Sequence, residues 1–292
     1  MVDYLLQQLL NGLVIGSFLA LMTVGFSMTY GVIRLANFAH GDIGYMMGVY
    51  VAVSAYFAGV PIALALVVGL GFAALLGLVV VRVAYKPVFF APRLVMLLTT
   101  IGVSIFLENL AMVIWGAQAR PFPVPVDNPF IKVGSVRLFL LQGVVIAVTV
   151  LLAISMHVLV HHTRLGKSMR ATAEDMETAK IMGINVNRVV YGTFLLGTFL
   201  GSVAGILAAV YYNSISPLMG FTPTLKAFCI AVLGGIGSLP GALVGGVLMG
   251  IVEALGAGYI HSGFRDGFAY LLLFVFLVFL PNGLFGKSRE RA

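Results

Sequence analysis

The chain alternates between long apolar runs and short polar connectors, a pattern that predicts membrane-spanning helices. A spanning helix needs about 20 mainly apolar residues, and these runs are continuous instead of alternating as barrel strands do. Spans are predicted near 5–29, 39–57, 60–81, 94–115, 138–160, 189–212 and 267–285, and an eighth apolar region, 225–257, is interrupted by glycine and proline. We therefore expect an all-α polytopic bundle of about 8 spans with two glycine-broken or re-entrant segments, forming one domain over residues 1–292.

The composition agrees with residence in a membrane. Hydrophobic residues make up 61% of the chain and charged residues only 9%, with a mean hydropathy of +1.08. A soluble domain of this length could not bury so much apolar surface, so a soluble enzyme, a disordered chain and a nucleic-acid-binding protein are excluded. The one cysteine, Cys229, excludes a disulfide framework within the chain and a multi-cysteine metal site.

The basic residues are distributed unequally between the two sides of the predicted membrane. Twelve fall on one side: Arg34, Arg82, Lys86, Arg93, Arg164, Lys167, Arg170, Lys180, Arg188, Lys287, Arg289 and Arg291. Five fall on the other: Arg120, Lys132, Arg137, Lys226 and Arg265. Lysine and arginine retain loops in the cytoplasm, so the larger set predicts the cytoplasmic face. The N-terminus is then outside and the C-terminus inside, provided that 225–257 enters and leaves by the same face.

Two breaks interrupt the hydrophobic pattern, Arg34–Gly44 in the first half and Leu233–Gly241 in the second. Glycine-interrupted segments placed alike in two halves indicate a transport site, although tight loops at the membrane surface account for them equally well. Polar groups inside spans are costly and are functional candidates, but structural pairing is the simpler role for any single one. The candidates for a translocation path are Asn37, His40, Asp42, Glu108, Asn109, Gly234, Gly235, Gly237 and Glu253.

The densest cluster of charges lies between two spans, in the connector 163–188. Its residues from Arg170 to Met182 are good helix formers, and Gly183 is a plausible helix stop. A short amphipathic helix of this kind either lies on the lipid surface or enters a groove on a soluble partner. The acidic residues Glu174, Asp175 and Glu177 favour the protein partner.

The chain carries no complete motif for ATP hydrolysis. Gly166-Lys167-Ser168 and Gly286-Lys287-Ser288 resemble the end of a phosphate-binding loop, but the required glycine is replaced by His161 and Pro281. No nucleophile–base constellation is evident either. We therefore expect a transport subunit that is not an enzyme and holds no cofactor.

Several segments, in this order, resemble one family. They are Gly31–Asp42, Arg170–Asp175, Met182–Asn185, Lys226–Phe228, Val232–Ala242 and Pro281–Gly286. The combination is similar to the LivH-type permeases, the inner-membrane subunits of bacterial ABC importers for branched-chain amino acids. The likeness extends over nearly the whole chain.

The resemblance implies partners that composition does not. Such a permease pairs with a second, LivM-like permease, two ATPase subunits bind the ATP, and an extracytoplasmic binding protein delivers the solute. The connector 163–188 would be the coupling loop that receives the ATPase. Its coupling candidates are Arg170, Ala173, Glu174, Asp175, Glu177, Lys180 and Gly183.

Leucine, isoleucine and valine are the expected solutes. Related permeases move urea, short amides or other amino acids, and these remain alternatives. The residues alone also permit a self-contained secondary carrier or channel, and less readily a membrane-embedded enzyme. The proline-rich segment 120–129 is either a stiff external connector or part of a docking surface for a partner.

Overall fold

A computed structural model describes residues 2–89, 91–123, 128–134, 136–279 and 283–285. The tail residues Lys287, Arg289 and Arg291 and the middle of the proline-rich segment lie outside the described residues. The α-helices are α1 (Val2–Ile33), α2 (Met47–Phe57), α3 (Ile62–Val80), α4 (Arg93–Trp115), α5 (Leu140–His162), α6 (Arg164–Glu174), α7 (Met176–Ile181), α8 (Val186–Tyr212), α9 (Phe221–Gly234), α10 (Leu239–Tyr259) and α11 (Arg265–Phe279). The shorter elements are the π-helices η1 (Asp42–Met46) and η2 (Val81–Tyr85), the 3₁₀ turns η3 (Lys86–Val88) and η4 (Ser262–Phe264), and the strands β1 (Phe130–Val133) and β2 (Val136–Phe139).

The architecture is the expected polytopic helical bundle. Within the described residues, seven helical segments are long and apolar enough to cross a membrane: α1, α3 with η2 and η3, α4, α5, α8, α10, and η4 with α11. Two predicted spans differ. The run 39–57 becomes η1 and α2, with 5 and 11 residues, and the interrupted region 225–257 becomes α9 and α10, with 14 and 21 residues.

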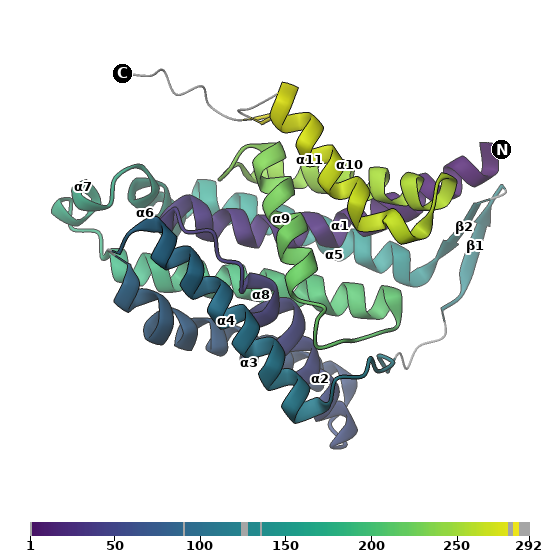
Figure 1. The fold of residues 1–292 in the computed structure, drawn as a ribbon, viewed down its shortest axis with the longest axis horizontal. Helices are drawn as coiled ribbons and strands as arrows, with labels where there is room; N and C mark the ends of the chain where they lie inside the picture. The colour runs from purple at the N-terminus through teal and green to yellow at the C-terminus, as the bar shows by residue number, and fades with distance from the viewer. Residues whose placement is uncertain (1, 90, 124–127, 135, 280–282, 286–292) are drawn as a thin grey trace.

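Contacts at the two ends of the bundle fix the direction of the helices (Figure 1). At one end, called here the hairpin end, β1 pairs with β2 in antiparallel register and the Arg137 N–H donates to Gln7 Oε1 at 2.9 Å. At the other, called the α6 end, Arg34 donates to the carbonyls of Ala173 and Glu174, each at 3.3 Å. Helix α1 therefore runs from the hairpin end to the α6 end. The N-terminus and the α6–α7 connector therefore lie at opposite ends, as the predicted orientation requires, and the assignment of the α6 end to the cytoplasm stays a prediction.

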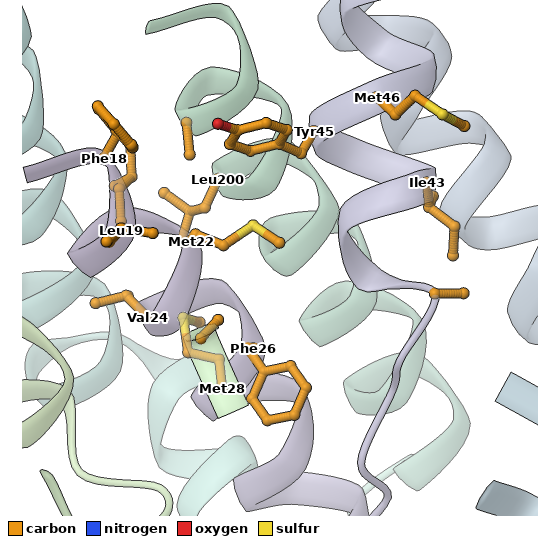
Figure 2. Close-up of a cluster of buried hydrophobic side chains, with 14 of the residues drawn as sticks. Phe18, Leu19, Met22, Val24, Phe26, Met28, Ile43, Tyr45, Met46 and Leu200 are labelled. Atoms are coloured by element: carbon orange, nitrogen blue, oxygen red, sulfur yellow. The ribbon is translucent and has the colours of Figure 1, made fainter. Parts of the chain in front are cut away.

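Helix α1 is the centre of the bundle and packs against α8, α9 and α10. Its side chains supply much of the buried cluster drawn in Figure 2, where Met22 lies beside Leu200 of α8 and Phe26 lies further along the helix, beside Met28. On its other side, α1 touches α10 backbone to backbone, since a Cβ added at Gly250 would lie 2.2 Å from Gly16 N. Such small-residue contacts drive helix association in lipid, where no hydrophobic effect acts between helices.

The bundle contains two copies of one arrangement, running in opposite directions. Helices α1 and α8 each end at a left-handed residue, Arg34 (φ 57°) and Asn213 (φ 47°), which are 179 residues apart (213 − 34). Each is followed by non-helical chain, and the short helices η1–α2 and α9 then begin at Asp42 and Phe221, again 179 residues apart (221 − 42). The short helix of each copy packs on the long helix of the other, η1 on α8 and α9 on α1. The structural counterpart of the first break is thus 213–220, and not the glycine-rich 233–241.

The contact between α1 and α10 yields a stability prediction. We expect Gly250→Ala to lower the melting temperature of the purified protein, because the new methyl group meets the α1 backbone and overpacking costs about 1–3 kcal/mol. The matched control is Gly102→Ala on α4, where an added Cβ has no neighbour within 4 Å. The control should melt no lower than the wild type. Equal melting temperatures for the two variants would contradict the backbone contact.

Candidate functional site

The first break begins with a non-helical segment, residues 34–39, that is held inside the bundle by side chains from other elements. Asn37 Oδ1 accepts hydrogen bonds from the Tyr85 hydroxyl at 2.7 Å and from the Ala39 N–H at 3.1 Å. Thr100 of α4 donates to the Ala36 carbonyl at 3.3 Å. Because water is absent from the hydrocarbon region, these partners let unwound backbone persist there.

Asp42 begins η1 and links the break to two further helices. The Ser104 hydroxyl of α4 donates to Asp42 Oδ2 at 2.5 Å, and the Gly41 N–H donates to Thr224 Oγ1 of α9 at 2.9 Å. Gly220 sits so close that a Cβ there would lie 2.1 Å from Asp42 Oδ1. The starts of the two short helices therefore meet at this carboxyl group.

His40 is fully buried beside the same break. Its ring occupies space left by glycines, since a Cβ at Gly25 would lie 3.0 Å from His40 Nε2 and one at Gly201 3.3 Å from it. Three predicted path residues, Asn37, His40 and Asp42, thus come together in one buried segment. Among the described residues, no group of three or more potential metal ligands is found.

Of the other path candidates, Glu108 lies closest to this segment. It is half-buried on α4, one turn after Ser104, and its carboxyl group interacts electrostatically with that of Asp42. The neighbouring Asn109 is exposed and donates to its own helix, at the Ile105 carbonyl. Gly234, Gly235 and Gly237 belong to the turn between α9 and α10 at the α6 end, where a Cβ on Gly237 would lie 3.6 Å from Gly31. The structure therefore brings Glu108 close to Asp42, but it does not join Asn109 and the three glycines into one site with them.

Glu253 lies in α10 and is the centre of an ionic network that reaches from the buried interior to the surface. Its Oε2 is 3.0 Å from Lys226 Nζ and its Oε1 is 2.6 Å from Arg265 Nε, while Lys226 Nζ is also 2.7 Å from Asp266 Oδ1. Two cations and two anions thus form a neutral chain, as buried charges require. The hydrophobic pattern singles out Glu253 but treats Lys226 as an external loop charge, whereas Lys226 is in α9 and only 7% exposed.

A cavity of about 470 Å³ opens beside this network near the hairpin end. It lies between α8, the segment 213–220, α9, α10 and α11, and the four residues of the network, Lys226, Glu253, Arg265 and Asp266, line it. A smaller cavity of about 60 Å³ lies further in, against α1. Pockets with a few convergent polar groups are typical of small-molecule sites.

The connector 163–188 folds into two helices in place of the single helix predicted from Arg170 to Met182. Asp175 ends α6 in an extended conformation (φ −151°) and caps α7, since its Oδ1 accepts from the N–H groups of Glu177 and Thr178 at 2.8 and 2.9 Å. The Thr178 and Glu177 N–H groups lower the pKa of the Asp175 carboxyl. The capping preference of aspartate was a visible signal for this boundary.

The coupling candidates occupy this helix pair. Arg170 donates to the Val160 carbonyl of α5, and Gly183 has a left-handed φ of 83° at the turn after α7. Arg170, Glu174, Asp175, Glu177 and Lys180 are exposed, and Ala173 is half-buried. Ile181 and Met182, which the pattern does not single out, are 84% and 76% exposed at the tip that α7 forms beyond the bundle (Figure 1).

Comparisons with known proteins give a consistent result. The family described as branched-chain amino acid transport system / permease component matches residues 8–280. The chain is 38% identical to the high-affinity branched-chain amino acid transport system permease protein LivH of Salmonella typhimurium, over 97% of this chain and 96% of that protein. It is 37% identical to the corresponding permease protein BraD of Pseudomonas aeruginosa, over the same shares. A solved structure, PsaBC from Streptococcus pneumoniae in complex with Fab, shares the fold, with a TM-score of 0.53 and 13% identity over 92% of this chain and 89% of that chain.

The cap on α7 gives a prediction for Asp175. Replacing it with alanine removes the acceptor of two N–H groups, so we expect faster hydrogen–deuterium exchange in a peptide spanning α7. Asp175→Asn keeps a capping oxygen and is the control. Because the pKa of Asp175 is lowered in the folded state, the ionic part of the cap is present above the unfolded pKa of aspartate and is lost as the pH falls through the folded value. Equal exchange in the alanine variant and the wild type would contradict this role.

Proposed function

The chain belongs to the family of branched-chain amino acid transport permeases, and on that basis we propose that it is the membrane-spanning subunit of an ATP-driven importer. Its solutes would be leucine, isoleucine and valine, delivered at the hairpin end by a soluble binding protein. The names of the relatives at 37–38% identity favour these solutes over urea or short amides. A second permease and two ATPase subunits would complete the transporter, and ATP would be bound by the latter.

The observation that carries the ATPase assignment is the exposed tip of α7. Ile181 and Met182 project at the end where Arg34 contacts α6, which is the end that the charge distribution predicts to be cytoplasmic. These two exposed apolar side chains follow the exposed charged residues Glu177 and Lys180 on α7, and an apolar centre beside charged residues is typical of a protein interface. We assign the α6–α7 pair as the element that docks the ATPase.

Hydrogen bonds at both ends of the first break connect this docking element to the bundle through the chain of the break itself. The α6 carbonyls bind Arg34, which begins the first break, and the break is bound in turn to α4 through Ser104 and to α9 through Thr224. A displacement of α6 would therefore pull on the segment where the two short helices meet. This arrangement supports a role for the break, with Asn37, His40 and Asp42, in opening and closing the path.

The docking assignment is tested by replacing both exposed residues at the tip, Ile181→Asp together with Met182→Asp. We expect the amount of ATPase that co-purifies with the permease to fall at least about tenfold, because truncating an interface hot spot costs about 2 kcal/mol or more. The control is Ile131→Asp in β1, which is 68% exposed at the hairpin end. Normal ATPase stoichiometry in the double variant would refute the assignment.

A second variant separates docking from transmission. Arg34→Asn keeps a residue that tolerates the left-handed conformation but removes the guanidinium that holds α6. We expect the ATPase to remain bound while leucine uptake per ATP hydrolysed falls in proteoliposomes. Arg188→Ala, an exposed arginine at the start of α8, is the control. Unchanged coupling in Arg34→Asn would show that Arg34 does not transmit the movement.

A further inference from the structure

We propose that the cavity at the hairpin end is a transit site for the zwitterionic head group of the amino acid. The ligand carboxylate would bind the Arg265 guanidinium, and the ligand ammonium would bind the Asp266 carboxylate. The inference rests on the proposed function, amino-acid transport, and adds to it the place and the chemistry of binding.

The charge balance of the network favours a zwitterion over an ion. Lys226, Glu253, Arg265 and Asp266 sum to zero, and Lys226 and Glu253 have side chains only 8% and 2% exposed. A ligand with net charge would place an unbalanced charge beside the buried Lys226–Glu253 pair, which is costly where water is scarce. A zwitterion adds one charge of each sign and leaves the site neutral. It can also replace existing ion pairs one for one.

The outer members of the network have binding capacity left over. Arginine carries five N–H donors, and in the described residues the recorded ion pair of Arg265 uses only Nε, at an angle that does not meet the geometry of a hydrogen bond. Its guanidinium otherwise lies over the Tyr212 ring, 5.1 Å from the centroid. The side chains of Arg265 and Asp266 are 33% and 55% exposed. Both can therefore meet a ligand that enters from the hairpin end.

The rest of the cavity suits a branched aliphatic side chain. Ala208 and Ala209 of α8 form one wall, and Leu218, Met219 and Pro223 contribute apolar atoms from the segment before α9 and from α9 itself. The volume of about 470 Å³ lies within the range of roughly 300–1,000 Å³ found for small-molecule sites. An entrance that carries both positive and negative side chains, beside an apolar wall, matches an aliphatic amino acid better than a sugar.

The inner side of the network leads towards the first break. The outer and inner cavities share Tyr45, Tyr212, Pro223 and the Lys226–Glu253 pair, so these residues form the partition between them. Tyr45 belongs to η1, three residues after Asp42. Rearrangement of the ion pairs around a ligand would thus move the residues that separate the outer cavity from the inner one.

The test uses the complete importer in proteoliposomes, without binding protein, carrying Cys229→Ala and Ser214→Cys. Ser214 is exposed and lines the cavity, whereas the native Cys229 is buried. We expect L-leucine to slow modification of the introduced thiol by a membrane-impermeant reagent. Leucinamide, which lacks the carboxylate, and 4-methylpentanoate, which lacks the ammonium, should not. The control thiol, Ala58→Cys in the exposed α2–α3 turn at the hairpin end, should be indifferent to all three compounds.

Arg265→Gln and Asp266→Asn, added to the Ser214→Cys background, should each weaken protection by leucine at least about tenfold, the change expected for loss of a charge-assisted contact. ATP-dependent leucine uptake is measured in parallel with binding protein present. Three results would each overturn the transit site and leave the proposed function intact. They are leucine uptake without any protection of the thiol, protection by the two analogues equal to that by leucine, and full protection by leucine in both variants. Absence of leucine uptake by the wild-type importer would instead overturn the proposed function.

Discussion

The need to satisfy backbone polar groups where water is absent governs how this bundle is built. Residues 34–39 are neither helix nor sheet, yet they lie among membrane-length helices. Tyr85 and Thr100 bind this segment, and just after it Thr224 binds the Gly41 N–H and Ser104 binds Asp42. These partners come from η2, α4 and α9, so the positions of three other elements are tied to one irregular segment.

The need to bring these polar partners close together also explains where glycines occur. Gly16 and Gly250 allow α1 and α10 to touch, and Gly25 and Gly201 leave room for the His40 ring. Side chains at these positions would push the long helices apart and withdraw the partners of the break. The hydrogen bonds to the break therefore depend on close helix packing, because short hydroxyl side chains reach their partners only across a narrow gap.

The hydrophobic pattern predicts the long helices well and the irregular parts poorly. The runs 94–115 and 138–160 correspond to Arg93–Trp115 and Leu140–His162, since span length follows directly from local apolar content. The network around Glu253 joins residues 27 and 12 positions away in sequence, and only tertiary packing brings Lys226 and Arg265 to it. In sequence, the segment 213–220 resembles an ordinary loop. Its correspondence to the first break becomes visible only from the path of the backbone in three dimensions. The path and coupling candidates remain predictions, although Asn37, His40 and Asp42 prove to be neighbours.

The two copies of the helix–break–helix arrangement, 179 residues apart and antiparallel, bear on how the protein enters its membrane. Each copy presents a similar apolar pattern in either direction, so hydropathy alone does not tell the insertion machinery which way round to place it. That information resides in the connectors that the copies do not share, chiefly the arginines and lysines of 82–93 and 164–180. A few side chains outside the repeated unit thus determine the sidedness of the whole molecule, and with it the direction in which the solute is carried.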